Sequence, residues 1–156
     1  MLNCIVRWTP RGIEYVEADP RQVEKLLREI ELKGANGAVT PSVKVLSHQA
    51  ESESDLPEKE FTRFRALAAR ANYLAADRID VLYAAKEVCG FMSRPADVAM
   101  GMLKRLAQYL RARPLMVFDY EFQTAEGIDC YTDVDWAGCA RTRKSTSGVV
   151  SWLGDI

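Results

Sequence analysis

Two short runs of strand-forming residues open the chain and are separated by a turn signal. Residues 2–8 and 13–17 are rich in β-branched and aromatic residues. The link between them contains Pro10 and Gly12, residue types that favour a tight change of chain direction. This arrangement predicts a β-hairpin at the N-terminus.

A helical pattern follows the hairpin. Asp19 and Pro20 form a helix-start signal, in which the acid caps and the proline occupies the first helical position. Apolar residues then recur at helical spacing at positions 23, 26, 27 and 30, and Gly34 is suited to end the helix. Residues 35–59 lose this periodicity and carry the acidic run 51–55, so we expect a solvated linker there.

Three helical stripes occupy the middle of the chain. Asp80 is expected to cap the second of these helices, and Pro95 to open the third. The apolar positions that define the three stripes are 61, 64, 67, 68, 71 and 74, then 82, 85, 89 and 92, then 98, 102, 103, 106, 109 and 110. Their spacing predicts packed core faces, a far commoner use of such stripes than ligand binding.

Strand patterns finish the chain. Residues 115–121, 128–133 and 145–153 read as three antiparallel strands, separated by turn residues such as Gly127. The predicted fold class is therefore α+β, with an N-terminal hairpin and helix, a central helical block and C-terminal antiparallel strands. The predicted divisions are residues 1–59, 60–124 and 125–156.

Composition indicates a packed globular chain. Hydrophobic residues make up 48% of its 156 residues, but no run approaches the roughly 20 apolar residues that span a bilayer. No signal peptide is visible, so the expected compartment is cytosol or nucleus, with no membrane partner. The cysteines, at positions 4, 89, 130 and 139, form no C-x-x-C pair, and His48 is the one histidine. A zinc site is not expected, and the thiols are predicted to be buried or half-buried.

Charge is unevenly distributed along a chain of net charge −1. Residues 61–114 contain ten Lys or Arg and four Asp or Glu, whereas residues 115–135 contain six acids and no base. The basic block could follow a phosphate backbone, and its candidate contacts are Lys104, Arg105, Arg111 and Arg113. The alternative is that these cations only solvate helix surfaces.

Candidate chemistry is concentrated near the end of the second C-terminal strand. Alternation places residues 128, 130 and 132 on one side and residues 129, 131 and 133 on the other. Asp133 therefore lies at the strand end, and Asp135 shares its side if the strand continues. Such carboxylates can ligate a divalent cation, Mg²⁺ above all. They could equally form a charged strand end with a solvated turn.

Several short sequence motifs, taken together, resemble those of one family. Residues 131–138 (YTDVDWAG) and 143–148 (RKSTSG) resemble the opening of the ribonuclease H domain in copia-type retrotransposon Pol polyproteins. Motifs upstream of these are similar to segments of the connecting region and of the end of the reverse transcriptase of that family. They occur in the same order along the chain as in the family. They are residues 12–15, 23–27, 39–41, 72–75, 77–81, 91–93, 103–106 and 109–110.

The resemblance implies roles for individual residues. Asp133 matches the first metal-binding aspartate of that ribonuclease H family, and Asp135 with Trp136 matches the accompanying signature. The implied cofactor is Mg²⁺, and the implied partner is an RNA–DNA hybrid or other nucleic acid. Ile79 stands where the family usually has proline, and Gly101 stands inside a helix, which are departures from the family pattern.

The resemblance also implies an incomplete catalytic set. The later ribonuclease H carboxylates and the paired polymerase aspartates have no counterparts in this sequence, so we expect a catalytically incomplete fragment of the polyprotein. The alternative is a stand-alone nucleic-acid-binding or protein-interaction module that uses the basic helical block. The predicted ribonuclease H-like sheet is incomplete, and residues 147–153 carry Val149, Val150, Trp152 and Leu153, so self-association through a free strand edge is expected.

Overall fold

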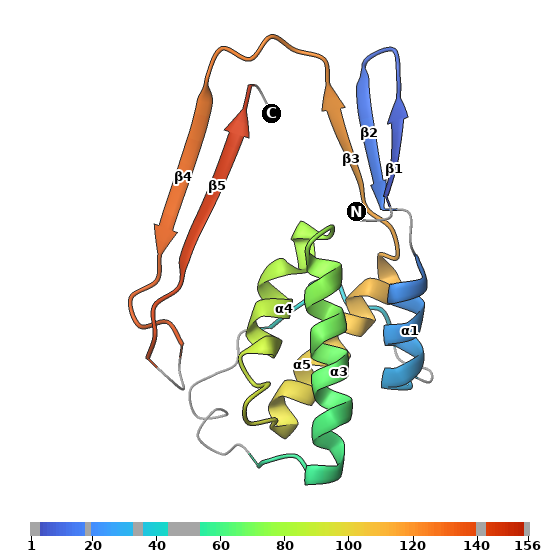
Figure 1. Ribbon diagram of the computed structural model, residues 1–156, viewed down its shortest axis with the longest axis vertical. Coiled ribbons are helices and arrows are strands. Elements are labelled where there is room, and N and C mark those ends of the chain that lie inside the picture. Colours follow the sequence, from blue (N-terminus) through green and yellow to red (C-terminus); the bar gives the residue numbers. More distant parts are fainter. Residues whose placement is uncertain (1–3, 18–19, 33–35, 44–53, 140–142, 155–156) are drawn as a thin grey trace.

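The computed structural model describes residues 4–17, 20–32, 36–43, 54–139 and 143–154 (Figure 1). The elements in chain order are β1 (Cys4–Trp8), β2 (Gly12–Glu17), α1 (Pro20–Ile30), α3 (Glu58–Ala75), the 3-10 helix η1 (Ile79–Val81), α4 (Leu82–Cys89), α5 (Asp97–Ala112), β3 (Val117–Glu121), β4 (Ile128–Val134) and β5 (Ser147–Leu153). This arrangement confirms the α+β class. The expected cap Asp19, the stop Gly34 and His48 lie outside the described residues.

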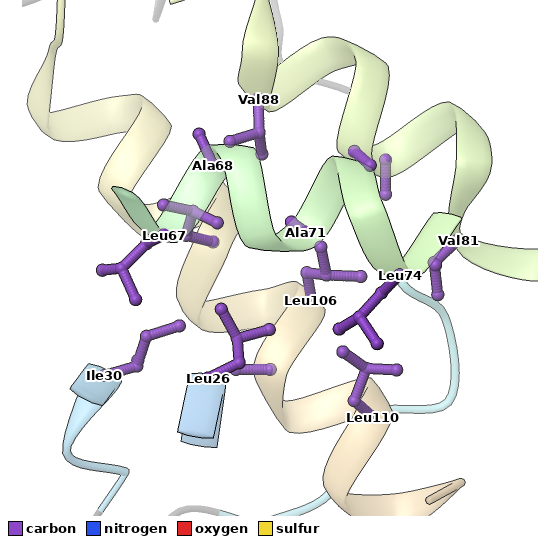
Figure 2. Packing of buried hydrophobic residues seen from close by; sticks show 14 of the residues in the cluster. Leu26, Ile30, Leu67, Ala68, Ala71, Leu74, Val81, Val88, Leu106 and Leu110 are labelled. Atoms are coloured by element: carbon purple, nitrogen blue, oxygen red, sulfur yellow. The ribbon is translucent and has the colours of Figure 1, made fainter. Parts of the chain in front are cut away.

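The helices pack into one hydrophobic core. Leu26 and Ile30 of α1 point toward Leu67 of α3 and toward Leu106 and Leu110 of α5 (Figure 2). Leu26, Leu67, Leu106 and Leu110 are fully buried. Each such side chain stabilises the fold by about 1.5–3 kcal/mol relative to its exposed state. The helical stripes predicted for α3 and α5 are thereby confirmed as core faces.

The stripe predicted for α4 was wrong at its first position. Leu82 is 50% exposed, whereas Ala84, Ala85 and Val88 are buried against α3. Asp80 does not cap this helix either, because it lies inside η1 and the N-cap residue is Val81. Val81 at the end of η1 is buried, and the next residue, Leu82, points away from the core.

The N-terminal sheet includes β3, a strand that follows the helices in sequence. Its order is β1-β2-β3, and β3 pairs antiparallel with β2, with Gly12 opposite Glu121. A Cβ at position 12 would collide with the backbone of β3, so glycine permits this close approach. The sequence pattern grouped β3 with the C-terminal strands, whereas the structure places it beside the predicted hairpin.

The remaining two strands form a separate sheet, the β4–β5 hairpin. Its register runs from Ile128 opposite Leu153 to Val134 opposite Ser147, and every residue in both strands is exposed. Figure 1 shows the two sheets extending from the helical unit on separate sides, joined by the segment between β3 and β4. Cys130 is an exposed free thiol, contrary to the predicted burial, while Cys89 and Cys139 are half-buried.

Gly101 occupies an exposed position in α5, and a Cβ there would meet no atom within 4 Å. Packing therefore does not require glycine at this position. Within the described part of the chain, none of the helices has both the length and the apolarity to cross a bilayer.

Candidate functional site

Asp133 lies near the end of β4 and faces an open position. Its cross-strand partner is Gly148, and a Cβ added at that glycine would meet only the Asp133 carbonyl oxygen, at 4.0 Å. Asp133 itself is exposed. The glycine leaves the space beside the aspartate free of a side chain, so the carboxylate is accessible to a solvated cation.

Asp135 is turned into the loop that follows β4. Its backbone N–H donates to the Thr146 carbonyl oxygen at 3.0 Å, and the Thr146 N–H donates to the Asp135 carboxylate. The Ala137 N–H donates to the Ser145 hydroxyl at 3.0 Å, which closes the same loop. Asp135 therefore holds the loop together through one carboxylate oxygen, and β4 ends at Val134 before reaching it.

These two acids can hold at most one weakly bound cation by themselves. Mg²⁺ accepts one or two protein carboxylates and keeps several waters, which fits Asp133 with its exposed surroundings. Two-metal phosphodiester cleavage needs carboxylates from several elements, with ions about 3.5–4 Å apart. Among the described residues, no group of three or more Asp, Glu, His or Cys could hold a metal ion. The strand end therefore offers the carboxylates of Asp133 and Asp135 and no cluster of further acidic, cysteine or histidine ligands among the described residues.

The four candidate phosphate contacts have different surroundings. The Arg105 guanidinium donates to the carbonyl oxygen and hydroxyl of Thr40, at 3.1 and 3.0 Å, and Arg111 Nη1 donates to the Leu32 carbonyl oxygen at 3.2 Å. These two arginines bind chain segments that precede α3. Lys104 and Arg113 are exposed. Arg105 and Arg111 therefore also bond to other parts of the chain, and the role of the four cations toward phosphate stays a prediction.

Sequence reasoning missed a buried ion pair at the junction of the helices. Arg78 is fully buried, and its Nε and Nη2 donate to the two carboxylate oxygens of Asp80 at 3.0 and 2.9 Å. Arg78 Nη2 also donates to the Arg113 carbonyl oxygen at 3.0 Å, and the Tyr109 hydroxyl donates to Asp80 at 2.8 Å. The pair therefore ties the α3–α4 link to the end of α5.

The environment of this network shifts two pKa values. Burial by itself raises the pKa of Asp80, but the hydrogen bonds from Arg78 and Tyr109 and the charge of Arg78 hold it below the ordinary value of 3.8. Burial, followed by the bond to Asp80, raises the pKa of Tyr109. The one sequence signal for this network was the spacing of an arginine and an aspartate, two residues apart, between two helical stripes.

A second contact at this junction involves the N-terminal sheet. The Tyr15 hydroxyl on β2 donates to Asp77 Oδ1 at 2.8 Å. Asp77 directly precedes Arg78, so the link between α3 and η1 contacts both the N-terminal sheet and the end of α5. This link therefore joins the N-terminal sheet to the end of α5, and it is not part of the candidate site on β4.

Comparison with known proteins identifies relatives among transposon polyproteins. The chain is 28% identical over 153 residues to the retrovirus-related Pol polyprotein from transposon RE2 of Arabidopsis thaliana, covering 98% of the chain and 10% of that protein. It is 31% identical over 93 residues to the Pol polyprotein from transposon RE1 of the same plant, covering 60% of the chain and 6% of the relative. An uncharacterized mitochondrial protein of this plant is 32% identical over 91 residues, or 58% of the chain and 38% of that protein.

These similarities confirm the resemblance to retrotransposon Pol polyproteins. The chain spans a tenth or less of the length of the two Pol polyproteins. No family model matches the chain, and no solved structure matches it.

Proposed function

We propose that this homologue of transposon Pol polyproteins is the segment that connects a copia-type reverse transcriptase region to the start of a ribonuclease H region. The observation that carries the proposal is the β4–β5 hairpin, in which the solvent-accessible Asp133 lies one residue before the end of β4, opposite Gly148. The alignment over 98% of the chain with a transposon Pol polyprotein supports it. The predicted division at residues 124 and 125 falls in the segment between the two sheets.

The chemistry proposed for the strand end is cation binding beside nucleic-acid phosphate. Asp133 would supply a carboxylate ligand, and Asp135 would keep the following loop folded next to it through its bond from Thr146. A bound Mg²⁺ would supply charge neutralisation and Lewis acidity for a phosphate group. The carboxylates for a second ion are not present on β4 or β5, so we propose that the chain is catalytically incomplete by itself.

The purified chain is therefore expected not to cleave the RNA strand of an RNA–DNA hybrid. Cleavage of a labelled hybrid would be measured with Mg²⁺ and with Mn²⁺, for the unmodified chain and for Asp133→Asn. Asp129→Asn is the matched control, because Asp129 lies on the same face of β4, four residues earlier. Cleavage that disappears in Asp133→Asn and persists in Asp129→Asn would contradict the proposal, since it would require a complete site.

Titration with Mg²⁺ tests the proposed cation site at Asp133. Addition of Mg²⁺ is expected to shift the amide resonances of residues 132–136 in the unmodified chain. The shift should be lost in Asp133→Asn and retained in Asp129→Asn. Shifts that are equal in all three proteins would show that the strand end has no cation site.

A second candidate function is a stand-alone nucleic-acid-binding module based on α5. The observation that favours it is the exposed position of Lys104 and Arg113, which leaves both side chains facing solvent. Arg105 and Arg111 are less suited to this role because they also bind Thr40 and Leu32.

This alternative predicts weak binding that is indifferent to sequence and falls steeply with salt. Each phosphate contact adds about 0.7–0.9 to the slope of log affinity against log salt concentration. Lys104→Glu and Arg113→Glu should each lower the affinity and the slope, and thermal melts should be unchanged. Charge reversal at Arg105 or Arg111 should lower the melting temperature as well. An affinity that stays constant as salt rises would show that these cations only solvate the helix.

A further inference from the structure

Three apolar side chains form an exposed stripe on η1 and α4. Ile79, Leu82 and Tyr83 are 60%, 50% and 63% exposed. Their spacing of three and four residues places them on one side of consecutive helical turns, and Lys86 continues that side, with its Nζ 5.5 Å from the centre of the Tyr83 ring. Single exposed apolar residues are ordinary, but a contiguous stripe marks a surface that another element can cover.

One face of the β4–β5 hairpin is also apolar at its centre. Val150 and Trp152 share this face with Tyr131, because opposite residues of paired strands lie on the same side and successive residues alternate. Thr146 belongs to the same side: it precedes Val150 by four residues, and the Asp135 N–H donates to its carbonyl oxygen at 3.0 Å, which continues the pairing. We call the face of Tyr131, Val150 and Trp152 the inner face.

The inner face is the side of the hairpin that meets the helices. The Lys86 ammonium donates to the Thr146 hydroxyl at 2.9 Å. Val150 on the inner face is 44% exposed, whereas its neighbour Val149 on the opposite face is 65% exposed. Figure 1 shows β5 between β4 and the helical unit. The apolar centre of the hairpin therefore lies on the side of α4.

The two apolar surfaces extend in the same direction from this contact. β5 runs from Thr146 toward the end of the helical unit at which η1 and the start of α4 lie (Figure 1). Lys86 to Ile79 spans about 10 Å along a helix, and Thr146 to Val150 spans about 13 Å along a strand. The apolar centre of the inner face therefore reaches the same height along the molecule as the apolar stripe.

We propose that the η1–α4 stripe is the docking surface for the inner face of the hairpin, and that the hairpin closes on it as a strap that pivots at the contact between Lys86 and Thr146. Both surfaces belong to one chain and are already joined at one end, so closure avoids most of the translational and rotational cost of bringing two molecules together. A two-stranded sheet is only marginally stable by itself, and the stripe would provide the cover that this hairpin lacks.

The distribution of charge on the hairpin permits this closure. The inner face carries two acids, Asp129 and Asp133, and both are on β4, the strand farther from α4. Closure of β5 on the stripe therefore buries apolar side chains and leaves the carboxylates at the rim, in water. It covers one face of the hairpin and leaves the strand edges free. The proposal does not depend on cation binding at Asp133.

Amide hydrogen exchange of β4 and β5 tests the closure, at concentrations at which sedimentation shows a monomer. Leu82→Ser should speed exchange in the hairpin about two- to tenfold, because the hairpin loses part of its cover. Leu115→Ser is the matched control, since Leu115 is 54% exposed and lies between α5 and β3. This control should exchange like the unmodified chain. Equal exchange in Leu82→Ser and Leu115→Ser would overturn the proposal.

A cycle of double substitutions separates docking from the strength of the hairpin itself. Val150→Ser and Val149→Ser both weaken β5, but only Val150 is on the inner face. Leu82→Ser should therefore have little further effect on exchange in a chain with Val150→Ser, and its full effect in a chain with Val149→Ser. The same further effect in both chains would overturn the proposal. An effect of Leu82→Ser that appears only at concentrations at which the chain associates would also overturn it, because a second copy would then be the cover.

Discussion

Replacement of Asp80 by alanine is expected to lower the free energy of unfolding by about 3–5 kcal/mol. The substitution would leave the guanidinium of Arg78, whose side chain is 1% exposed, without its paired carboxylate. It would also remove the acceptor of the Tyr109 hydroxyl. The loss is large because the buried guanidinium retains its desolvation cost after the attraction to the Asp80 carboxylate is gone.

Chemical denaturation followed by far-UV circular dichroism would measure this loss. Asp129→Ala is the control, since Asp129 is exposed on β4 and its replacement should change stability by no more than about 0.5 kcal/mol. The double substitution Arg78→Met with Asp80→Leu should recover much of the loss by replacing the pair with apolar groups. A loss for Asp80→Ala no larger than that for Asp129→Ala would show that the ion pair does not stabilise the fold.

The same network predicts a pH dependence. Because the pKa of Asp80 is lowered in the folded protein, the stabilisation is complete above its ordinary value of 3.8 and is lost as pH falls through the folded pKa. The difference in stability between the unmodified chain and Asp80→Asn should therefore be constant near neutral pH and shrink below about pH 4. A difference in stability that stays constant down to pH 2 would argue against a lowered pKa of Asp80.

Self-association through the β4–β5 hairpin is the second large expected effect. Both strands are exposed along their whole length, and the hairpin carries Val149, Val150, Trp152 and Leu153 at 43–66% exposure. A two-stranded sheet is marginally stable by itself, and its free edges can pair with strands of another chain. The full chain is therefore expected to associate at roughly micromolar to millimolar concentrations.

Sedimentation velocity at several matched concentrations would test this expectation. A shorter chain that ends at Thr124 should stay monomeric, because it lacks the hairpin and retains β3 in the N-terminal sheet. Ending the chain before β3 would be a poor comparison, since it would expose the edge of β2. Val149→Lys in the full chain should weaken association by placing a charge on β5. A full chain that remains monomeric at all these concentrations would contradict the prediction.

The sequence by itself determined most of the local structure. Apolar residues repeat every 3.6 residues in a helix and every 2 residues in a strand. These periods reflect which side chains can share a face, and this depends only on backbone geometry. The stripes of α3 and α5, the N-terminal hairpin and strands β3, β4 and β5 were predictable for this reason. The position of Asp133 near a strand end and the resemblance to transposon Pol polyproteins were likewise readable from residues close together in sequence.

Only the tertiary structure decided which distant elements meet. The strand pattern at residues 115–121 carries no information about its partner, and packing of α1 against α5 is what brings β3 to β2. Asp80 has the sequence position of a helix cap, but a neighbouring arginine in a buried junction offers its carboxylate a stronger partner. Lys86 likewise resembles any surface lysine until Thr146 is placed beside it. The physical reason is the same in each case: hydrogen bonds and burial depend on groups far apart in the chain, and local propensity does not encode those distances.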